Sequence, residues 1–154
     1  MRSLKISLII LLFIILNNLV FGQEQTLFTD SYSNALAEAQ KNGKSIMLYF
    51  AGTDWCRPCI QMKKQIFEKE QFKEFAESHL IPVIVDFPRL KKNQLAENVK
   101  AQNEMLANKY NNSGVFPLIV FLDSSGKLIE TTYFENRSVE EYINYLTKIL
   151  NKRD

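Results

Sequence analysis

Residues able to carry metal or covalent chemistry are scarce in this 154-residue chain, which has two cysteines and one histidine. Zinc held by the cysteines would need two more soft ligands, and only His79 remains, so zinc is disfavoured. Covalent haem needs a histidine directly after the second cysteine, where this chain has Ile60. No phosphate-binding glycine loop, catalytic triad or recognisable carboxylate pair is visible. We therefore expect no metal and no cofactor, and a structural or surface role for His79.

The chain also lacks features that would divide it into several domains. It contains no internal repeat, no low-complexity tract and no linker rich in proline or glycine. Hydrophobic residues make up 46% of the chain, which is enough for one core. We expect one domain, residues 23–154.

The longest apolar run, residues 6–16, falls short of the roughly 20 residues that a membrane span needs. It follows Arg2 and Lys5 and precedes small or permissive residues that end at Gly22. This pattern predicts a secretory signal peptide, residues 1–22, cleaved after Gly22; a retained membrane anchor is the alternative. No cysteine follows the run, which disfavours a lipoprotein.

The remaining chain has no excess charge, because removing Arg2 and Lys5 leaves 17 basic and 17 acidic residues. We therefore expect neither nucleic acid nor an acidic membrane as a partner. One basic cluster, Arg89, Lys91 and Lys92, is either a docking edge for an acidic partner or an ordinary solvated loop. We expect an exported monomer, periplasmic or secreted, that is not stably inserted in a membrane after cleavage.

Both cysteines lie in residues 54–59, Asp-Trp-Cys-Arg-Pro-Cys. At the start of a helix, residues three apart share a face with Cβ atoms roughly 5–6 Å apart, close to disulfide range. A ring this small removes little entropy from the unfolded chain, so it is a poor structural staple. Export places the pair where disulfides persist. The spacing therefore favours a pair that exchanges two electrons.

Hydrophobic periodicity predicts the element order α-β-α-β-α-β-β-α. The predicted helices cover residues 31–42, 57–67, a second stretch after a break at 68–70, 95–110 and 139–149; the predicted strands cover 45–50, 81–86, 117–123 and 127–134. Helices separate the first three strands and a tight hairpin joins the last two, which predicts a mixed sheet of four or five strands with helices on both faces.

This element order, the Trp-Cys-x-Pro-Cys segment after the first strand, and the Phe116-Pro117 pair at the third strand resemble the thioredoxin superfamily over residues 30–150. The local sequence at residues 50–56 is similar to that of secreted bacterial thioredoxin-like proteins and of the C-terminal periplasmic domain of the thiol:disulfide interchange reductase. The resemblance implies a thioredoxin-like α/β fold and a thiol–disulfide oxidoreductase that acts on protein disulfides with a redox partner protein, most readily as a reductase. The alternative is a binding or assembly module whose disulfide stays oxidised.

The resemblance and the motif together imply a role for each cysteine. Cys56 would lie at a helix start, where free backbone amides favour a reachable thiolate that attacks a substrate disulfide. Cys59, one turn further and facing the core, would resolve the mixed disulfide. Arg57 would tune the pair through its charge, and Pro58 suits the first helical turn because it needs no donor there.

Three residues, Trp55, Phe116 and Pro117, are predicted to bind the substrate. The resemblance implies a cis proline at Pro117, against the alternative of a trans proline that merely starts a strand. Phe116 would offer its backbone to a substrate strand. Trp55 would form an apolar platform for the substrate, or simply pack. Asp54 would cap the helix, or else tune the thiols.

Two departures from the thioredoxin pattern leave details open. The strand at residues 46–50 lacks the buried acid that helps to deprotonate the resolving cysteine in thioredoxins. Tyr49, Asp54 or water could accept that proton. Arg57 replaces the usual glycine, and a cation there could make the pair more oxidising, so oxidase and isomerase behaviour stay open.

Overall fold

The computed structural model describes residues 26–153, and the predicted signal peptide lies outside this range. Within it, no helix is both long and apolar enough to cross a membrane. The helices are α2 (Tyr32–Asn42), α3 (Arg57–Met62), α4 (Glu70–His79), α5 (Glu97–Tyr110) and α6 (Val139–Leu150). The strands are β1 (Ser45–Ala51), β2 (Leu80–Asp86), β3 (Leu118–Leu122) and β4 (Leu128–Tyr133). Three short helical turns complete the fold: η1 (Lys63–Phe67), η2 (Lys91–Asn93) and η3 (Asn151–Arg153).

The four strands form one mixed sheet, as predicted, and their order in it is β2-β1-β3-β4. Strand β1 runs parallel to β2 and antiparallel to β3, and β4 returns antiparallel to β3 as the second arm of the hairpin. A fifth strand is reduced, among the residues described, to a single parallel bridge between Thr29 and Val83 at the edge of β2.

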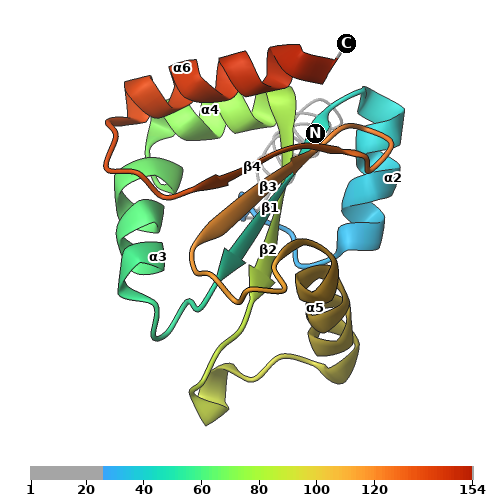
Figure 1. Cartoon of the computed structure of the whole chain (residues 1–154), viewed down its shortest axis with the longest axis vertical. Coiled ribbons are helices and arrows are strands. Elements are labelled where there is room, and N and C mark those ends of the chain that lie inside the picture. The colour runs from blue at the N-terminus through green and yellow to red at the C-terminus, as the bar shows by residue number, and fades with distance from the viewer. Residues whose placement is uncertain (1–25, 154) are drawn as a thin grey trace, which may run out of the picture.

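Helices cover both faces of the sheet (Figure 1), and the side chains of β1 alternate between two buried layers. Met47 and Tyr49 pack with α3, α4 and α6 on one face, while Ile46 and Leu48 pack with α2 and α5 on the other. Every residue of β1 is buried, because this strand has a neighbour on each side and helices on both faces. That position explains why its sequence is a continuous apolar run.

Local signals set the helix ends. Ser31 caps α2, and Gly43 ends it in the left-handed conformation at φ 67°. A capping box begins α6, with the side chains of Ser138 and Glu141 each accepting a hydrogen bond from the other's backbone N–H. The predicted helix over residues 57–67 instead divides into α3 and a π-helical turn, η1.

Three connections meet at one end of the sheet, which is the lower end in Figure 1. Parallel pairing puts Ala51, the end of β1, opposite Asp86, the end of β2. Antiparallel pairing places Leu118, the start of β3, opposite Phe50. The turn at residues 52–56, the segment 87–96 and the loop 111–117 are therefore brought together by strand register.

Candidate active site

The cysteine pair opens helix α3. The turn after β1 is closed by the Cys56 backbone N–H, which donates to the Gly52 carbonyl at 2.8 Å. This turn makes Cys56 the N-cap of α3 and puts Pro58 in the first helical turn. Cys56 and Cys59 form a disulfide with their Cα atoms 5.2 Å apart.

The start of α3 also provides the Cys56 sulfur with a hydrogen-bond donor. Its Sγ accepts a hydrogen bond from the Cys59 backbone N–H at 3.3 Å. After reduction, this amide and the other free N–H groups of the first turn would stabilise negative charge on the same sulfur. The geometry thus favours Cys56 over Cys59 as the thiolate that attacks.

Both cysteines are largely covered. Cys59 is 2% exposed and faces the core formed by α3, α4 and α6, as predicted, but Cys56 is also only 4% exposed. Cys56 was expected to be more accessible than this. A substrate disulfide must therefore pack closely against the residues around Cys56 to reach its sulfur. The neighbours of Cys56 thus determine access to the disulfide.

Tyr49 lies at the base of the site. Its hydroxyl donates to the Cys59 carbonyl oxygen at 2.9 Å, and the side chain is 3% exposed. Burial raises the pKa of Tyr49 well above its ordinary value, and the Asp86 carboxylate acts in the same direction. The phenol is a neutral donor near neutral pH and is unsuited to accept a proton from Cys59.

Asp54 does not cap α3, so that prediction was wrong. The turn that begins at Gly52 places Cys56, two residues after Asp54, at the cap position. The Asp54 carboxylate instead accepts the backbone N–H groups of Arg89 at 3.0 Å and Leu90 at 2.9 Å, and the Asn93 side-chain amide at 3.0 Å. The Arg89 N–H lowers the pKa of Asp54 most, and the other two donors add to this effect against an opposing desolvation.

A second carboxylate makes a matching connection. Asp86 accepts the backbone N–H of Thr53 at 2.9 Å and its hydroxyl at 2.6 Å. Asp54, in the turn, thus holds the segment that follows β2, while Asp86, at the end of β2, holds the turn. Asp86 and Thr53 were not among the predicted site residues; an acid at the end of a buried strand was the only available signal.

Trp55 is fixed on several sides. Its indole N–H donates to the Phe87 carbonyl at 2.7 Å, and its ring meets the Phe116 ring edge-on with centroids 5.5 Å apart. The guanidinium carbon of Arg89 lies 3.7 Å from the centroid of the indole ring. Gly52 lies so close to the indole that any Cβ there would overlap it. The indole is held in place and half-buried; its role as a substrate platform stays a prediction.

The loop before β3 supplies the other predicted binding residues. The Phe116–Pro117 peptide bond is cis, as the resemblance implied. The Asn111 side chain bonds both backbone groups of Val115, donating to its carbonyl and accepting its N–H, each at 2.9 Å. Phe116 lies between this clamped residue and the first residue of β3, next to Trp55.

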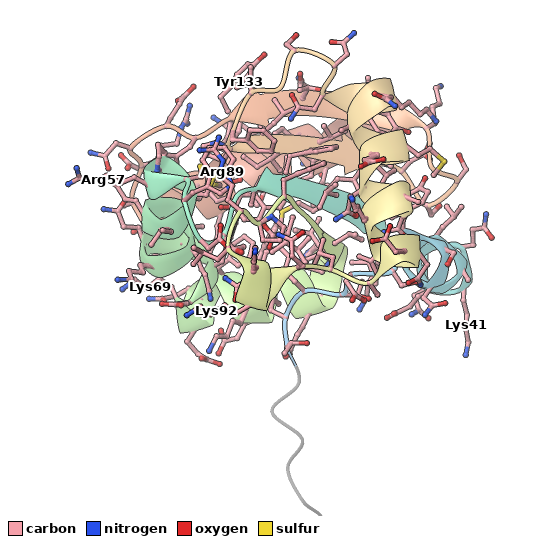
Figure 2. The ribbon with its side chains drawn as sticks, turned by 90° about the horizontal axis from the view of Figure 1, so that it is seen from below. Lys41, Arg57, Lys69, Arg89, Lys92 and Tyr133 are labelled. Atoms are coloured by element: carbon pink, nitrogen blue, oxygen red, sulfur yellow. A yellow bond between two sulfur atoms is a disulfide. The ribbon has the colours of Figure 1, made fainter. Side chains whose placement is uncertain are left out.

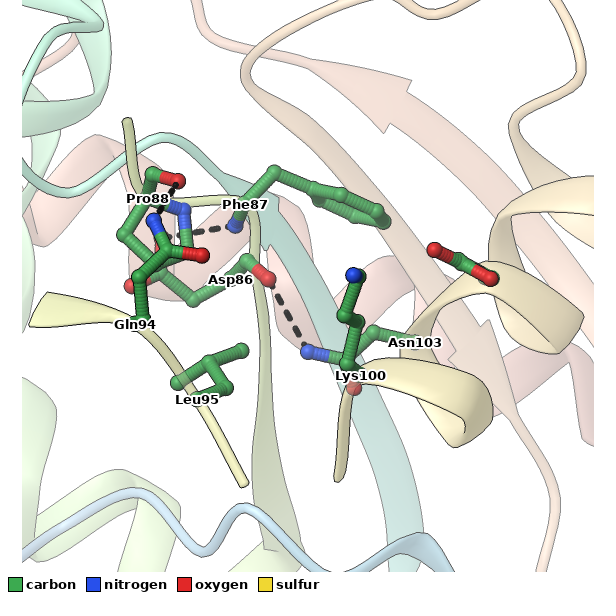
Figure 3. Close-up of a pocket in the computed structure, with 8 residues that line it drawn as sticks. Asp86, Phe87, Pro88, Gln94, Leu95, Lys100 and Asn103 are labelled. Carbon is green, nitrogen blue, oxygen red and sulfur yellow. Dashed lines mark hydrogen bonds between the residues drawn. The ribbon is translucent and has the colours of Figure 1, made fainter. Parts of the chain in front are cut away.

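Other candidate features lie apart from the disulfide. A small cavity of about 110 Å³ lies between the segment after β2 and α5, where Asn103 donates to the Asp86 carbonyl at 3.0 Å (Figure 3). Neither cysteine lines it. His79 is exposed and its ring stacks on Phe75, which fits a structural or surface role. Across residues 26–153, no cluster of three or more His, Cys, Asp or Glu residues could hold a metal ion.

Replacing Asp54 by alanine should loosen the segment after β2. The Arg89 and Leu90 N–H groups lose their acceptor, so we expect their amide hydrogen exchange to accelerate about tenfold or more. In the wild type, acid should likewise lower the protection factors of these two amides, which compare their exchange with the intrinsic rate at the same pH. Because the pKa of Asp54 is lowered on folding, its contribution is complete above the ordinary value of 3.8 and is lost as the pH falls through the folded value.

Hydrogen-exchange mass spectrometry of the two regions would measure this effect. Asp123→Ala is the matched control, because Asp123 likewise has a lowered pKa and accepts backbone N–H groups, but in the β3–β4 turn. It should leave exchange at Arg89 and Leu90 unchanged. Equal exchange in Asp54→Ala and the wild type would show that the carboxylate does not hold the segment.

Comparisons with known proteins agree with this arrangement. Residues 32–147 match the family model described as a thioredoxin-like domain. The disulfide bond reductase DsbH of Chlamydia pneumoniae is 38% identical over 124 residues, which cover 80% of this chain and 73% of that protein. A solved structure of a DsbH oxidoreductase aligns with a TM-score of 0.73 at 37% identity, covering 80% of this chain and 83% of the other. A thioredoxin from Thermus thermophilus, at 23% identity and a TM-score of 0.56 over 77% of this chain and 82% of its own, shares the fold.

Proposed function

The chain belongs to the thioredoxin-like family of thiol–disulfide oxidoreductases, and from this premise we propose that it reduces disulfide bonds in exported proteins. The observation that carries the proposal is the Cys56–Cys59 disulfide at the start of α3, beside Trp55 and the cis Phe116–Pro117 bond. The reductase direction is supported by the name of its 38%-identical relative, a disulfide bond reductase.

The reaction proceeds in two exchange steps that move two electrons. In the reduced protein, the Cys56 thiolate attacks one sulfur of the substrate disulfide, which breaks; a mixed disulfide forms and one substrate thiolate leaves and is protonated by solvent. Cys59, whose proton passes to water, then attacks Cys56 Sγ and releases the second substrate thiolate. The protein ends as the disulfide seen here, and a dithiol donor must reduce it again.

The residues around the disulfide have distinct parts in this proposal. Phe116 presents its backbone to the substrate chain, and Trp55 covers the approach to Cys56 as an apolar surface. Arg57 adds positive charge beside the attacking thiolate. Residues 1–22 direct export, and residues 23–154 act as a monomer in the periplasm or outside the cell, with a redox partner protein as the electron donor.

A measured reduction potential tests this proposal. We expect a value above about −300 mV, within the range of known exchange catalysts. Equilibration in dithiothreitol redox buffers can be followed by the fluorescence of Trp55, which is the only tryptophan and directly precedes Cys56. The low exposure of both cysteines favours a second candidate, a binding module with a permanent disulfide. A potential below about −300 mV would support that module and contradict the reductase.

A further inference from the structure

The segment between β2 and α5 presents positive charge beside the disulfide. Arg89, Lys91 and Lys92 are all exposed, and no ion pair within the described part of the chain includes any of them. Arg57, in the first turn of α3, is exposed as well. Figure 2 shows Arg57, Arg89 and Lys92 in one part of the molecule, with Lys41 at the opposite end.

The backbone of this segment is held in a fixed position. Asp54 accepts the N–H groups of Arg89 and Leu90, and it also accepts the side-chain amide of Asn93 at the end of η2. The carboxylates of Asp54 and Asp86 thus accept hydrogen bonds from backbone N–H groups and from the side chains of Asn93 and Thr53. Asp54 thereby positions the backbone of the basic segment, and among residues 26–153 neither acid forms an ion pair with Arg89, Lys91 or Lys92.

Arg89 is the best placed of the three cations. Its guanidinium lies over the Trp55 indole, next to the reactive cysteine in sequence. Stacking uses the face of the guanidinium, while its N–H donors point outward from its edge, where they can bind a carboxylate in a two-point geometry. Less side-chain entropy is lost on binding, because the stack already restricts the side chain.

An apolar residue lies within the same row. Leu90, between Arg89 and the two lysines, is 48% exposed. A surface that places one exposed apolar side chain among three cations fits a polypeptide that carries acidic and apolar residues. A polypeptide is also the kind of molecule that brings a disulfide to Cys56. Residues 23–154 are balanced in charge overall, so the positive row is a local feature.

We propose that Arg89, Lys91 and Lys92 form a docking rim that selects disulfide substrates with acidic residues next to the reacting cysteine. The inference rests on the proposed reductase function and adds the class of substrate. Opposite charges speed encounter between the two chains and orient the substrate disulfide toward Cys56.

Three peptides test the rim. They contain the same intramolecular disulfide, flanked by aspartates, by lysines or by serines, and each is mixed with the reduced protein in a single turnover followed by Trp55 fluorescence. At low salt we expect the acidic peptide to react about tenfold faster than the basic one. The ratio should approach one near 1 M salt, where the screening length is about 3 Å.

Variants locate the effect. In Arg89→Gln/Lys91→Gln/Lys92→Gln the preference should be lost, and Lys91→Gln/Lys92→Gln, which keeps the Arg89–Trp55 stack, should show a reduced preference. Lys41→Gln/Lys127→Gln/Lys148→Gln removes the same charge from α2, the β3–β4 turn and α6, and should keep it.

The outcomes distinguish a failure of the docking rim from a failure of the proposed reductase function. Wild-type protein that reacts with none of the three peptides contradicts the reductase itself. Equal rates for all three peptides overturn the docking rim alone. This holds whether or not the protein binds vesicles of anionic phospholipid. A preference that survives in the Arg89, Lys91 and Lys92 variant, or is lost equally in the Lys41, Lys127 and Lys148 variant, also overturns it.

Discussion

Cys56→Ser should lower the rate of insulin reduction by dithiothreitol to that of dithiothreitol alone. A serine hydroxyl stays protonated near neutral pH and cannot replace the thiolate that attacks a disulfide. The helix start around residue 56, including the Cys59 N–H that bonds to Cys56 Sγ, remains available to a serine oxygen, which is a good N-cap. The variant should therefore keep its fold, as circular dichroism can verify, and lose only its chemistry.

Cys59→Ser should accumulate mixed disulfides at Cys56, because the thiol that releases the substrate is missing. Mass spectrometry of the protein incubated with a disulfide peptide would find the adduct mass, and the Cys56→Ser/Cys59→Ser double variant is the control without either thiol. Adducts formed by Cys56→Ser and not by Cys59→Ser would reverse the assigned roles. That comparison matters because the two residues differ little in exposure, 4% against 2%, so the argument for Cys56 depends on its place at the N-cap.

The cysteine pair was predictable because its signal is local, and the cis proline was predictable only through the resemblance to the thioredoxin superfamily, which local motifs carry. Cys56 and Cys59 are one helical turn apart, and Phe116-Pro117 directly precedes an apolar run of strand length. The element order was predictable for a similar reason: each helix or strand shows its own hydrophobic period. Such patterns require no knowledge of which strands are neighbours.

The contacts that shape the rest of the site depend on strand register. Asp54 and Arg89 are 35 residues apart in the chain, and Thr53 and Asp86 are 33 apart. They meet because β1 and β2 pair in parallel and end together, with Ala51 opposite Asp86. A sequence pattern alone does not fix that register, so Asp54 was assigned to the nearest helix start instead of to a distant loop.

Tyr49 is a buried side chain of β1 that contacts the first turn of α3 and cannot act as a carboxylate would. The buried thioredoxin acid is absent from β1, and Tyr49 instead donates to the Cys59 carbonyl from beneath the disulfide. A buried phenol can position the first turn of α3, but it offers no carboxylate for proton transfer. The carboxylates of Asp54 and Asp86 accept hydrogen bonds from other groups, and water as the acceptor of the Cys59 proton stays a prediction.

Gly52→Ala should disturb both the stability of the fold and the chemistry of the site. The new methyl group would overlap the Trp55 indole, which is also held by the Phe87 carbonyl and by Arg89. Overpacking of this kind costs about 1–3 kcal/mol, so we expect the free energy of unfolding in urea to fall by that amount. Displacement of the indole beside Cys56 should also shift the Trp55 fluorescence and slow insulin reduction about tenfold or more.

A double-mutant cycle with Trp55→Phe separates the steric clash from a general effect of losing a glycine. Phenylalanine lacks the fused ring that meets the new methyl group, so Gly52→Ala should destabilise the Trp55→Phe protein by about 1 kcal/mol less than the wild type. Gly114→Ala is a further control: its φ of 65° disfavours alanine, but nothing lies within 4 Å of the added Cβ. It should reduce stability without moving the Trp55 fluorescence. Equal losses for Gly52→Ala in both backgrounds would mean that the indole does not set the requirement for glycine, and that the turn into α3 imposes it instead.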